Sequence, residues 1–143
     1  MAEKNQVAVV EKNITDNVLS RVQELETDGA IHFPKNYSYQ NALKSAYLIL
    51  RETTDKSGKS VLEACTKESI ANALLDMVIQ GLSPAKKQCY FIAYGSRLTM
   101  QRSYFGTQAV LKRVANVKNS FAVPIYEKDE FDYKIDLDTG NKV

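Results

Sequence analysis

A segment in the middle of the chain places basic and aromatic side chains next to one another. From residue 86 to residue 106 it reads KKQCYFIAYGSRLTMQRSYFG, with four basic residues, three tyrosines and no acid. Aromatic rings stack on nucleobases, at roughly 1–3 kcal/mol per base, and basic groups neutralise the phosphates. Residues of these types suit the binding of a single-stranded polyanion. Such a function requires contacts with the ligand and no bond breaking.

Basic and acidic residues are also unevenly distributed along the whole chain. Residues 77–126 carry seven basic and no acidic side chains, whereas residues 1–76 carry nine basic and eleven acidic ones. The net charge of +2 hides this asymmetry. Because summed charge sets the local electrostatic potential, the block favours an anionic partner. The alternative is chance, combined with a buried segment that tolerates few charges.

Other kinds of chemistry have little support. His32 is the only histidine, and it lies in a short connector beside a proline. Cys65 and Cys89 lack metal-ligand spacing, and without a secretory signal we expect both to be free thiols. Gly58-Lys59-Ser60 is not a P-loop, because Thr53 stands where the earlier glycine is required. We therefore expect a protein that is not an enzyme and needs no metal or cofactor.

The acidic residues near the C-terminus allow two interpretations. Glu127, Asp129, Glu130 and Asp132 lie close enough in sequence for a divalent-ion site. The interleaved Lys128 favours a solvated strand edge instead.

Four stretches with helical periodicity must position the central segment. Asn13 or Thr15 is a candidate N-cap for the first, Thr66 for the third and Ser103 for the fourth. The third stretch is apolar over most of its circumference, which predicts a core helix. The predicted helices span residues 14–26, 38–52, 66–80 and 104–117.

The central segment itself predicts a β-hairpin. Gly95-Ser96, between two alternating runs, fits a two-residue type II′ turn. This register pairs Tyr90 with Gln101 and Tyr94 with Arg97 on one exposed face, and it leaves the other face apolar. The tyrosines are base-stacking groups under one interpretation, and ordinary strand residues with Arg97 stacked on Tyr94 under the other.

The helix after the hairpin has an unusual pattern. Its predicted core-facing side carries Tyr104, Val110, Leu111, Val114 and Val117. Phe105 falls on the opposite side, together with Ala109 and Lys112. A phenylalanine beside a lysine on a solvated face indicates a contact surface.

These elements predict an α+β fold, with N-terminal helices packed on a small antiparallel sheet made of the hairpin and further strands at 120–126 and 130–136. The 143 residues suffice for one domain. They contain no signal peptide and no apolar run long enough for a membrane span. Asp138 to Asn141 is a turn signal with no strand after it, so we expect part of a longer, truncated domain.

Several short motifs in this region resemble one known family. They are Gly81-Leu-Ser-Pro84, Gln88-x-Tyr90-x-Ile92-x-Tyr94-Gly95, Gln101-x-x-Tyr104-x-Gly106 and Leu111-x-Arg113. In this order they resemble the RecT family, phage-type recombinases that anneal complementary single strands without ATP. The resemblance is strongest over residues 70–115, weaker over 120–136 and nearly absent over the first 60.

The chain departs from the family pattern at two positions. Ala93 stands where the family usually has proline, and Phe105 where it usually has lysine. We expect Phe105 to stack on a base or to pack on a neighbouring subunit in place of a phosphate contact.

The resemblance implies a cytoplasmic protein that binds single-stranded DNA and the annealed duplex intermediate, and that self-associates into a ring or filament. A partner exonuclease is a further implication, and no membrane is involved. Residues 1–65 would form a helical region that makes subunit contacts, and residues 66–143 part of the DNA-binding core. The candidate DNA-binding residues are Lys86, Lys87, Tyr90, Tyr94, Arg97, Gln101, Arg102, Tyr104, Phe105, Lys112, Arg113 and Lys118. The alternative function is a non-catalytic interaction module whose basic surface binds an acidic protein, with Phe105 as its hot spot.

Overall fold

The computed structural model describes residues 2–118, 120, 124–130, 132 and 134. Its helices are α1 (Ala2–Thr27), α2 (Tyr39–Glu52), α3 (Val61–Ala64), α4 (Lys67–Ile79) and α5 (Tyr104–Val114), with a 3₁₀ turn η1 (Pro84–Lys86). The strands β1 (Cys89–Tyr94) and β2 (Arg97–Arg102) form one antiparallel hairpin. The α+β class is therefore confirmed. No helix in the described part of the chain is long and apolar enough to cross a membrane.

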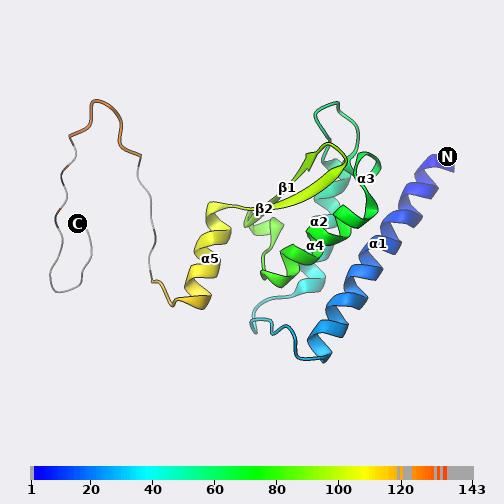
Figure 1. Ribbon diagram of the computed structural model, residues 1–143, viewed down its shortest axis with the longest axis horizontal. Coiled ribbons are helices and arrows are strands. Elements are labelled where there is room, and N and C mark those ends of the chain that lie inside the picture. The colour runs from blue at the N-terminus through cyan, green and yellow to red at the C-terminus, as the bar shows by residue number, and fades with distance from the viewer. Residues whose placement is uncertain (1, 119, 121–123, 131, 133, 135–143) are drawn as a thin grey trace.

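Helix α4 is the central element, as its apolar sequence predicts. It contacts α1, α2 and β2, and Figure 1 shows it between the hairpin and α1. Thr66 caps its first turn by accepting a hydrogen bond from the Ser69 N–H, and Gly81 follows its C-cap with φ +61°. Both were predicted from the residue types that helix ends require. Helix α2 likewise begins after the N-cap Ser38.

Helix α1 is longer than its apolar stripe predicts. Ile14, Val18 and Val22 are buried at helical spacing and face the core. The helix begins at Ala2, however, so neither Asn13 nor Thr15 is its N-cap and that prediction was wrong. The preceding residues include alanine, glutamate, lysine and glutamine, which are good helix formers and let the helix extend toward the N-terminus.

The hairpin has the predicted register at all six pairs, from Cys89↔Arg102 to Tyr94↔Arg97. Gly95 has φ +60°, as the first central position of a type II′ turn requires. The inner-face side chains of Phe91, Leu98 and Met100 are buried in the core. Strand β2 runs beside α4, whose Ser69 Oγ accepts a hydrogen bond from the Leu98 N–H at 3.0 Å.

Helix α5 differs from the prediction in length and in orientation. It ends at Val114, three residues early, and Val114 is 82% exposed although we expected it to face the core. The side that packs on the body carries Gly106, Val110 and Arg113, which are spaced four and three residues apart. A periodicity of large apolar residues does not detect this face, because two of its three members are glycine and arginine.

The strands predicted at 120–126 and 130–136 do not form in the described residues. Residues 124–126 belong to no strand, and a turn follows at 127–129. A hydrogen bond of 2.9 Å from the Tyr126 N–H to Asp129 Oδ2 closes that turn. Residues 121–123, 131, 133 and 135–143 lie outside the described part of the chain, including the turn predicted at 138–141. Sequence analysis also missed the short helix α3.

The loop before α3 contains the Gly-Lys-Ser motif and is closed by an internal carboxylate. One carboxylate oxygen of Asp55 accepts hydrogen bonds from the Ser57 N–H, the Ser57 hydroxyl and the Lys59 N–H, at 2.6–2.9 Å. These bonds hold the pKa of the Asp55 carboxyl below its usual value, the Ser57 hydroxyl contributing most. The backbone amides of Ser57 and Lys59, which a phosphate in this loop would need, already donate to the Asp55 carboxylate.

Candidate nucleic-acid interface

All twelve candidate DNA-binding side chains are exposed, and they fall into three groups. Tyr90, Tyr94, Arg97 and Gln101 lie on the outer face of the hairpin. Lys86, Lys87 and Arg102 lie at its open end, and Tyr104, Phe105, Lys112 and Arg113 are on α5, with Lys118 shortly after it.

The outer face of the hairpin is an exposed aromatic surface. The side chains of Tyr90 and Tyr94 are 51% and 54% exposed, and Ile92 between them is 37% exposed. Neither β1 nor β2 contains an acidic residue. This face therefore offers aromatic rings to a ligand without a negative charge on either strand.

The Tyr94 ring is held in place by a hydrogen bond along the strands. Gln101 Nε2 donates to Tyr94 Oη at 2.8 Å, although Gln101 is paired with Tyr90 and not with Tyr94. The two positions are separated by four residues along the hairpin, roughly 13 Å. The ring must therefore lean along the sheet toward Gln101, a geometry that fits a stacking surface.

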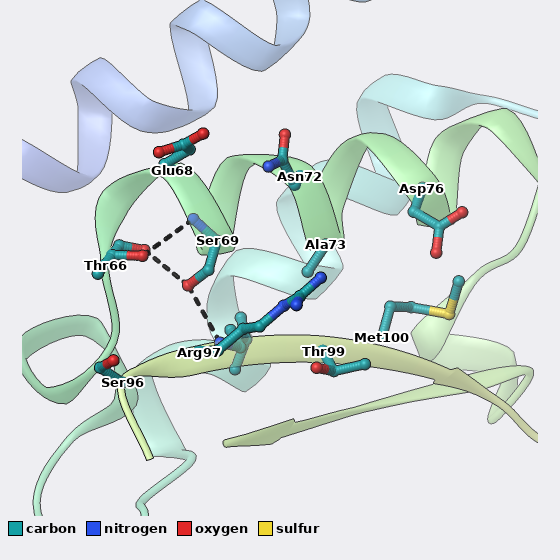
Figure 2. Close-up of a pocket in the computed structure, with 11 residues that line it drawn as sticks. Thr66, Glu68, Ser69, Asn72, Ala73, Asp76, Ser96, Arg97, Thr99 and Met100 are labelled. Atoms are coloured by element: carbon teal, nitrogen blue, oxygen red, sulfur yellow. Dashed lines mark hydrogen bonds between the residues drawn. The ribbon is translucent and has the colours of Figure 1, made fainter. Parts of the chain in front are cut away.

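The basic residues of the hairpin lie at its two ends. Arg97, beside the turn, extends over a groove of about 510 Å³ between β2 and α4 (Figure 2). Glu68 and Asp76 of α4 line the same groove and reduce the positive potential there. Arg102, at the open end, is paired with Cys89, and its side chain lies with the Gln88 carbonyl beside Gly106.

The open end meets α5 at a close backbone contact. The Gln88 carbonyl accepts the Ser103 N–H at 3.0 Å, and a Cβ at Gly106 would collide with that same carbonyl oxygen. Ser103 Oγ donates to the Lys87 carbonyl and accepts the Gly106 N–H, which caps α5. Only a glycine lets the first turn of α5 lie against Gln88.

Two arginines, one from β2 and one from α5, contact the C-terminal end of α4. Arg113 donates to the Gln80 carbonyl at 2.8 Å, and Arg102 donates to Gln80 Oε1 at 3.4 Å. Cations at a helix C-terminus compensate its exposed carbonyls and its dipole. A Cβ at Gly81 would collide with the Arg113 guanidinium. We call the set Gln80, Gly81, Gln88, Arg102, Ser103, Gly106 and Arg113 the α4–α5 junction.

Two aromatic side chains begin α5 on its exposed side. Phe105 is 55% exposed, in agreement with the expectation that it is not a core residue. Its ring packs edge-on against Tyr104, with the centroids 6.0 Å apart. Tyr104 Oη donates to the Ser120 carbonyl at 3.1 Å and accepts Gln108 Nε2 at 2.9 Å, which fixes the Tyr104 ring.

A buried thiol and a half-buried phenol near the junction stay protonated at ordinary pH because their pKa values are raised. Burial raises the pKa of the Cys89 thiol to about 11, so this free cysteine is a packing residue and not a nucleophile. Burial, and to a smaller extent Cys89, raises the pKa of the Tyr37 phenol, which donates to the Leu82 carbonyl at 3.0 Å. Among the described residues, no three His, Cys, Asp or Glu side chains form a metal-binding group.

A comparison with protein-family models gives one match, to the model described as RecT family, over residues 40–143. The match covers most of the chain. The chain belongs to the RecT family. Membership indicates a phage-type recombination protein of the annealing class. Searches of curated proteins and of solved structures found no match.

Some residues of the RecT motifs belong to the α4–α5 junction, and others lie on the outer face of the hairpin. Gly81, Gln88, Gly106 and Arg113 belong to the junction, where each makes or permits a specific contact. Tyr90 and Tyr94 are exposed, and Gln101 bonds to the latter. Sequence analysis missed the role of Gln80, for which the sequence carries no signal. The glycine in the first turn of α5 was a signal for the contact with Gln88.

Proposed function

We propose that this RecT-family protein binds single-stranded DNA on the outer face of the β1–β2 hairpin and anneals complementary strands without ATP. One observation carries the proposal. Tyr90 and Tyr94 are exposed on the same face of a hairpin that contains no acid, and Gln101 holds the Tyr94 ring along the sheet. Stacking of this kind tolerates any sequence, because every base has a π-face.

The mechanism is one of positioning. Lys86, Lys87 and Lys112, all exposed near the open end or on α5, would neutralise phosphates without reading bases. Bases that stack on the hairpin keep their Watson–Crick edges available, so a second strand can be tested by pairing. The protein needs no nucleotide hydrolysis for this exchange.

Assembly completes the proposal. Annealing along a strand requires many adjacent subunits, and family membership supports self-association into a ring or a filament. We propose subunit contacts for the helical region 1–65, and a role for Phe105 on a base or on the adjacent subunit. Action in the cytoplasm of a bacterium or an infected host cell, beside a partner exonuclease, belongs to the same proposal.

The test is a titration of labelled oligothymidylate, oligodeoxyadenylate and oligodeoxycytidylate at several salt concentrations. Tyr94→Ala should weaken binding to all three by about tenfold, because one stacked base is worth 1–3 kcal/mol. Its salt slope should stay unchanged. Lys112→Ala should lower the slope by about 0.7 units, the value for one phosphate contact on a single strand.

Tyr126→Ala is the matched control, since Tyr126 is 69% exposed but lies outside the hairpin, and it should bind like the parent chain. Equal binding by Tyr94→Ala and the parent contradicts the proposal. Binding of an acidic protein in preference to all three oligonucleotides would support an interaction module instead.

A further inference from the structure

A second pocket lies away from the outer face of the hairpin. It has a volume of about 300 Å³ and lies between the α1–α2 connector, the end of α4 and one side of α5. Its lining includes His32, Phe33, Arg102, Val110, Arg113 and Val114. Side chains alternate between the two faces of a strand, so Arg102 lies on the inner face of the hairpin and its neighbour Gln101 on the outer face. Arg102 can therefore reach the pocket. The volume is at the lower end of the range for small-ligand sites, about 300–1,000 Å³.

The pocket is positively charged. Two guanidinium groups line it, and none of the described lining residues is acidic. The C-terminal end of α4 contributes a negative charge of only about one half. Two full positive charges outweigh it, so the pocket favours an anion.

The guanidinium groups keep donors for a ligand. An arginine has about five N–H donors. Arg113 uses donors on the Ala109 and Gln80 carbonyls, and Arg102 uses one on Gln80 Oε1. These partners are neutral, and the nearby Asp76 carboxylate accepts from Gln80 Nε2 at 3.0 Å, so both arginines keep N–H groups for a ligand. His32, exposed at the rim, adds an imidazole.

Apolar side chains make up much of the remaining lining of the pocket. Val114 is 82% exposed and Ile79 50% exposed, and both line the pocket with Phe33 and Val110. Two arginines and several apolar side chains in one pocket match a ligand with one anionic and one apolar part. A nucleotide has this division, with its phosphate at one end and its sugar and base at the other.

We propose that this pocket binds one nucleotide unit of a nucleic-acid strand, with the phosphate on Arg102 and Arg113 and the sugar and base against Val110, Val114 and Phe33. The inference rests on the proposed function only in taking DNA as the source of that nucleotide. It adds a phosphate site on a side of the molecule that the stacking face does not reach.

The sole histidine of the chain provides the readout. The imidazole signals of His32 in proton NMR report on the pocket without isotope labelling. Thymidine 5′-monophosphate, added at constant pH, should shift them, and thymidine without the phosphate should not. Arg102→Gln, which keeps the side-chain methylenes that touch Gly106, should weaken the response about tenfold.

Arg51→Gln is the charge-matched control, since Arg51 lies in the last turn of α2 and does not line the pocket. Val114→Glu is a second variant on an exposed position and should abolish the shift by adding a negative charge. Leu48→Glu, at a 60% exposed position elsewhere, should not. Unchanged His32 signals at millimolar nucleotide, or an equal response in Arg102→Gln, would overturn the inference.

Two further arms identify the source of the phosphate. Oligothymidylates with and without a 5′-phosphate are compared in the parent chain and in Arg102→Gln. An affinity gain from the 5′-phosphate that Arg102→Gln removes indicates a strand end, whereas an equal loss for both oligonucleotides indicates an internal phosphodiester. Tyr94→Ala should leave the His32 response to the mononucleotide intact. If the hairpin fails to bind DNA while that response persists, the proposed function fails and the pocket stands.

Discussion

The outer face of the hairpin and the α4–α5 junction are built from the same run of motifs, yet they use opposite kinds of residue. The hairpin face presents large side chains to solvent, with Tyr90 and Tyr94 about half exposed. The junction depends on two glycines, Gly81 and Gly106, where any side chain would collide with a neighbouring group. The first region can lose a side chain without losing its shape, and the second cannot gain one.

This difference separates recognition from architecture within one motif set. Arg113 illustrates it best, because its place in a family motif suggested a phosphate contact. The Arg113 guanidinium donates a hydrogen bond to the carbonyl of Gln80, the C-cap of α4. It packs in the space that a Cβ at Gly81 would occupy. Arg113 therefore positions α5 first, and any phosphate contact uses the donors that remain.

The largest effect should come from Gly106→Ala. The new methyl group would strike the Gln88 carbonyl oxygen, which is backbone and cannot rotate away. Overpacking of this kind costs about 1–3 kcal/mol, and we expect the upper half of that range. Denaturant unfolding measures it. Gly95→Ala is the control, with open space at the Cβ but φ +60°, so it should cost only the backbone strain of about 1–2 kcal/mol. A Gly106→Ala variant as stable as the parent would break the comparison.

A smaller effect should come from Gly81→Ala, which combines strain at φ +61° with a collision against Arg113. The strain costs about 1–2 kcal/mol. Arg113→Ala alone should cost about 1 kcal/mol, the net value of one hydrogen bond. The double variant has no such collision. The stability losses of the two single variants should therefore sum to more than the loss measured for the double variant. A coupling free energy below about 0.5 kcal/mol would show that Gly81 and Arg113 act independently.

The hairpin was predictable because each of its determinants is local. Gly95-Ser96 selects the turn, the turn selects the register, and the alternation of Phe91, Leu98 and Met100 selects the buried face. The faces of α5 were not predictable in the same way. Its packing side is defined by the Gln88 carbonyl and the end of α4, which are distant in sequence, and apolar periodicity does not score glycine or arginine. The exposure of Tyr90, Tyr94 and Phe105 could be predicted, whereas the prediction that Tyr104 faces the core was wrong, since it is 48% exposed. The separation of the candidate residues into three groups could not be predicted.

The central claim is that DNA bases stack on the outer face of the hairpin, whereas the glycines of the junction hold α5 in place. Ultraviolet cross-linking of oligonucleotides that carry 5-iodouracil, followed by mass spectrometry of the peptides, tests it most directly, because the reaction favours an aromatic ring stacked on the base. The account predicts cross-links at Tyr90 and Tyr94, lost in the respective alanine variants, and none at Tyr126, which is more exposed than either. Cross-links confined to α1 or α4, with none on β1, would contradict it.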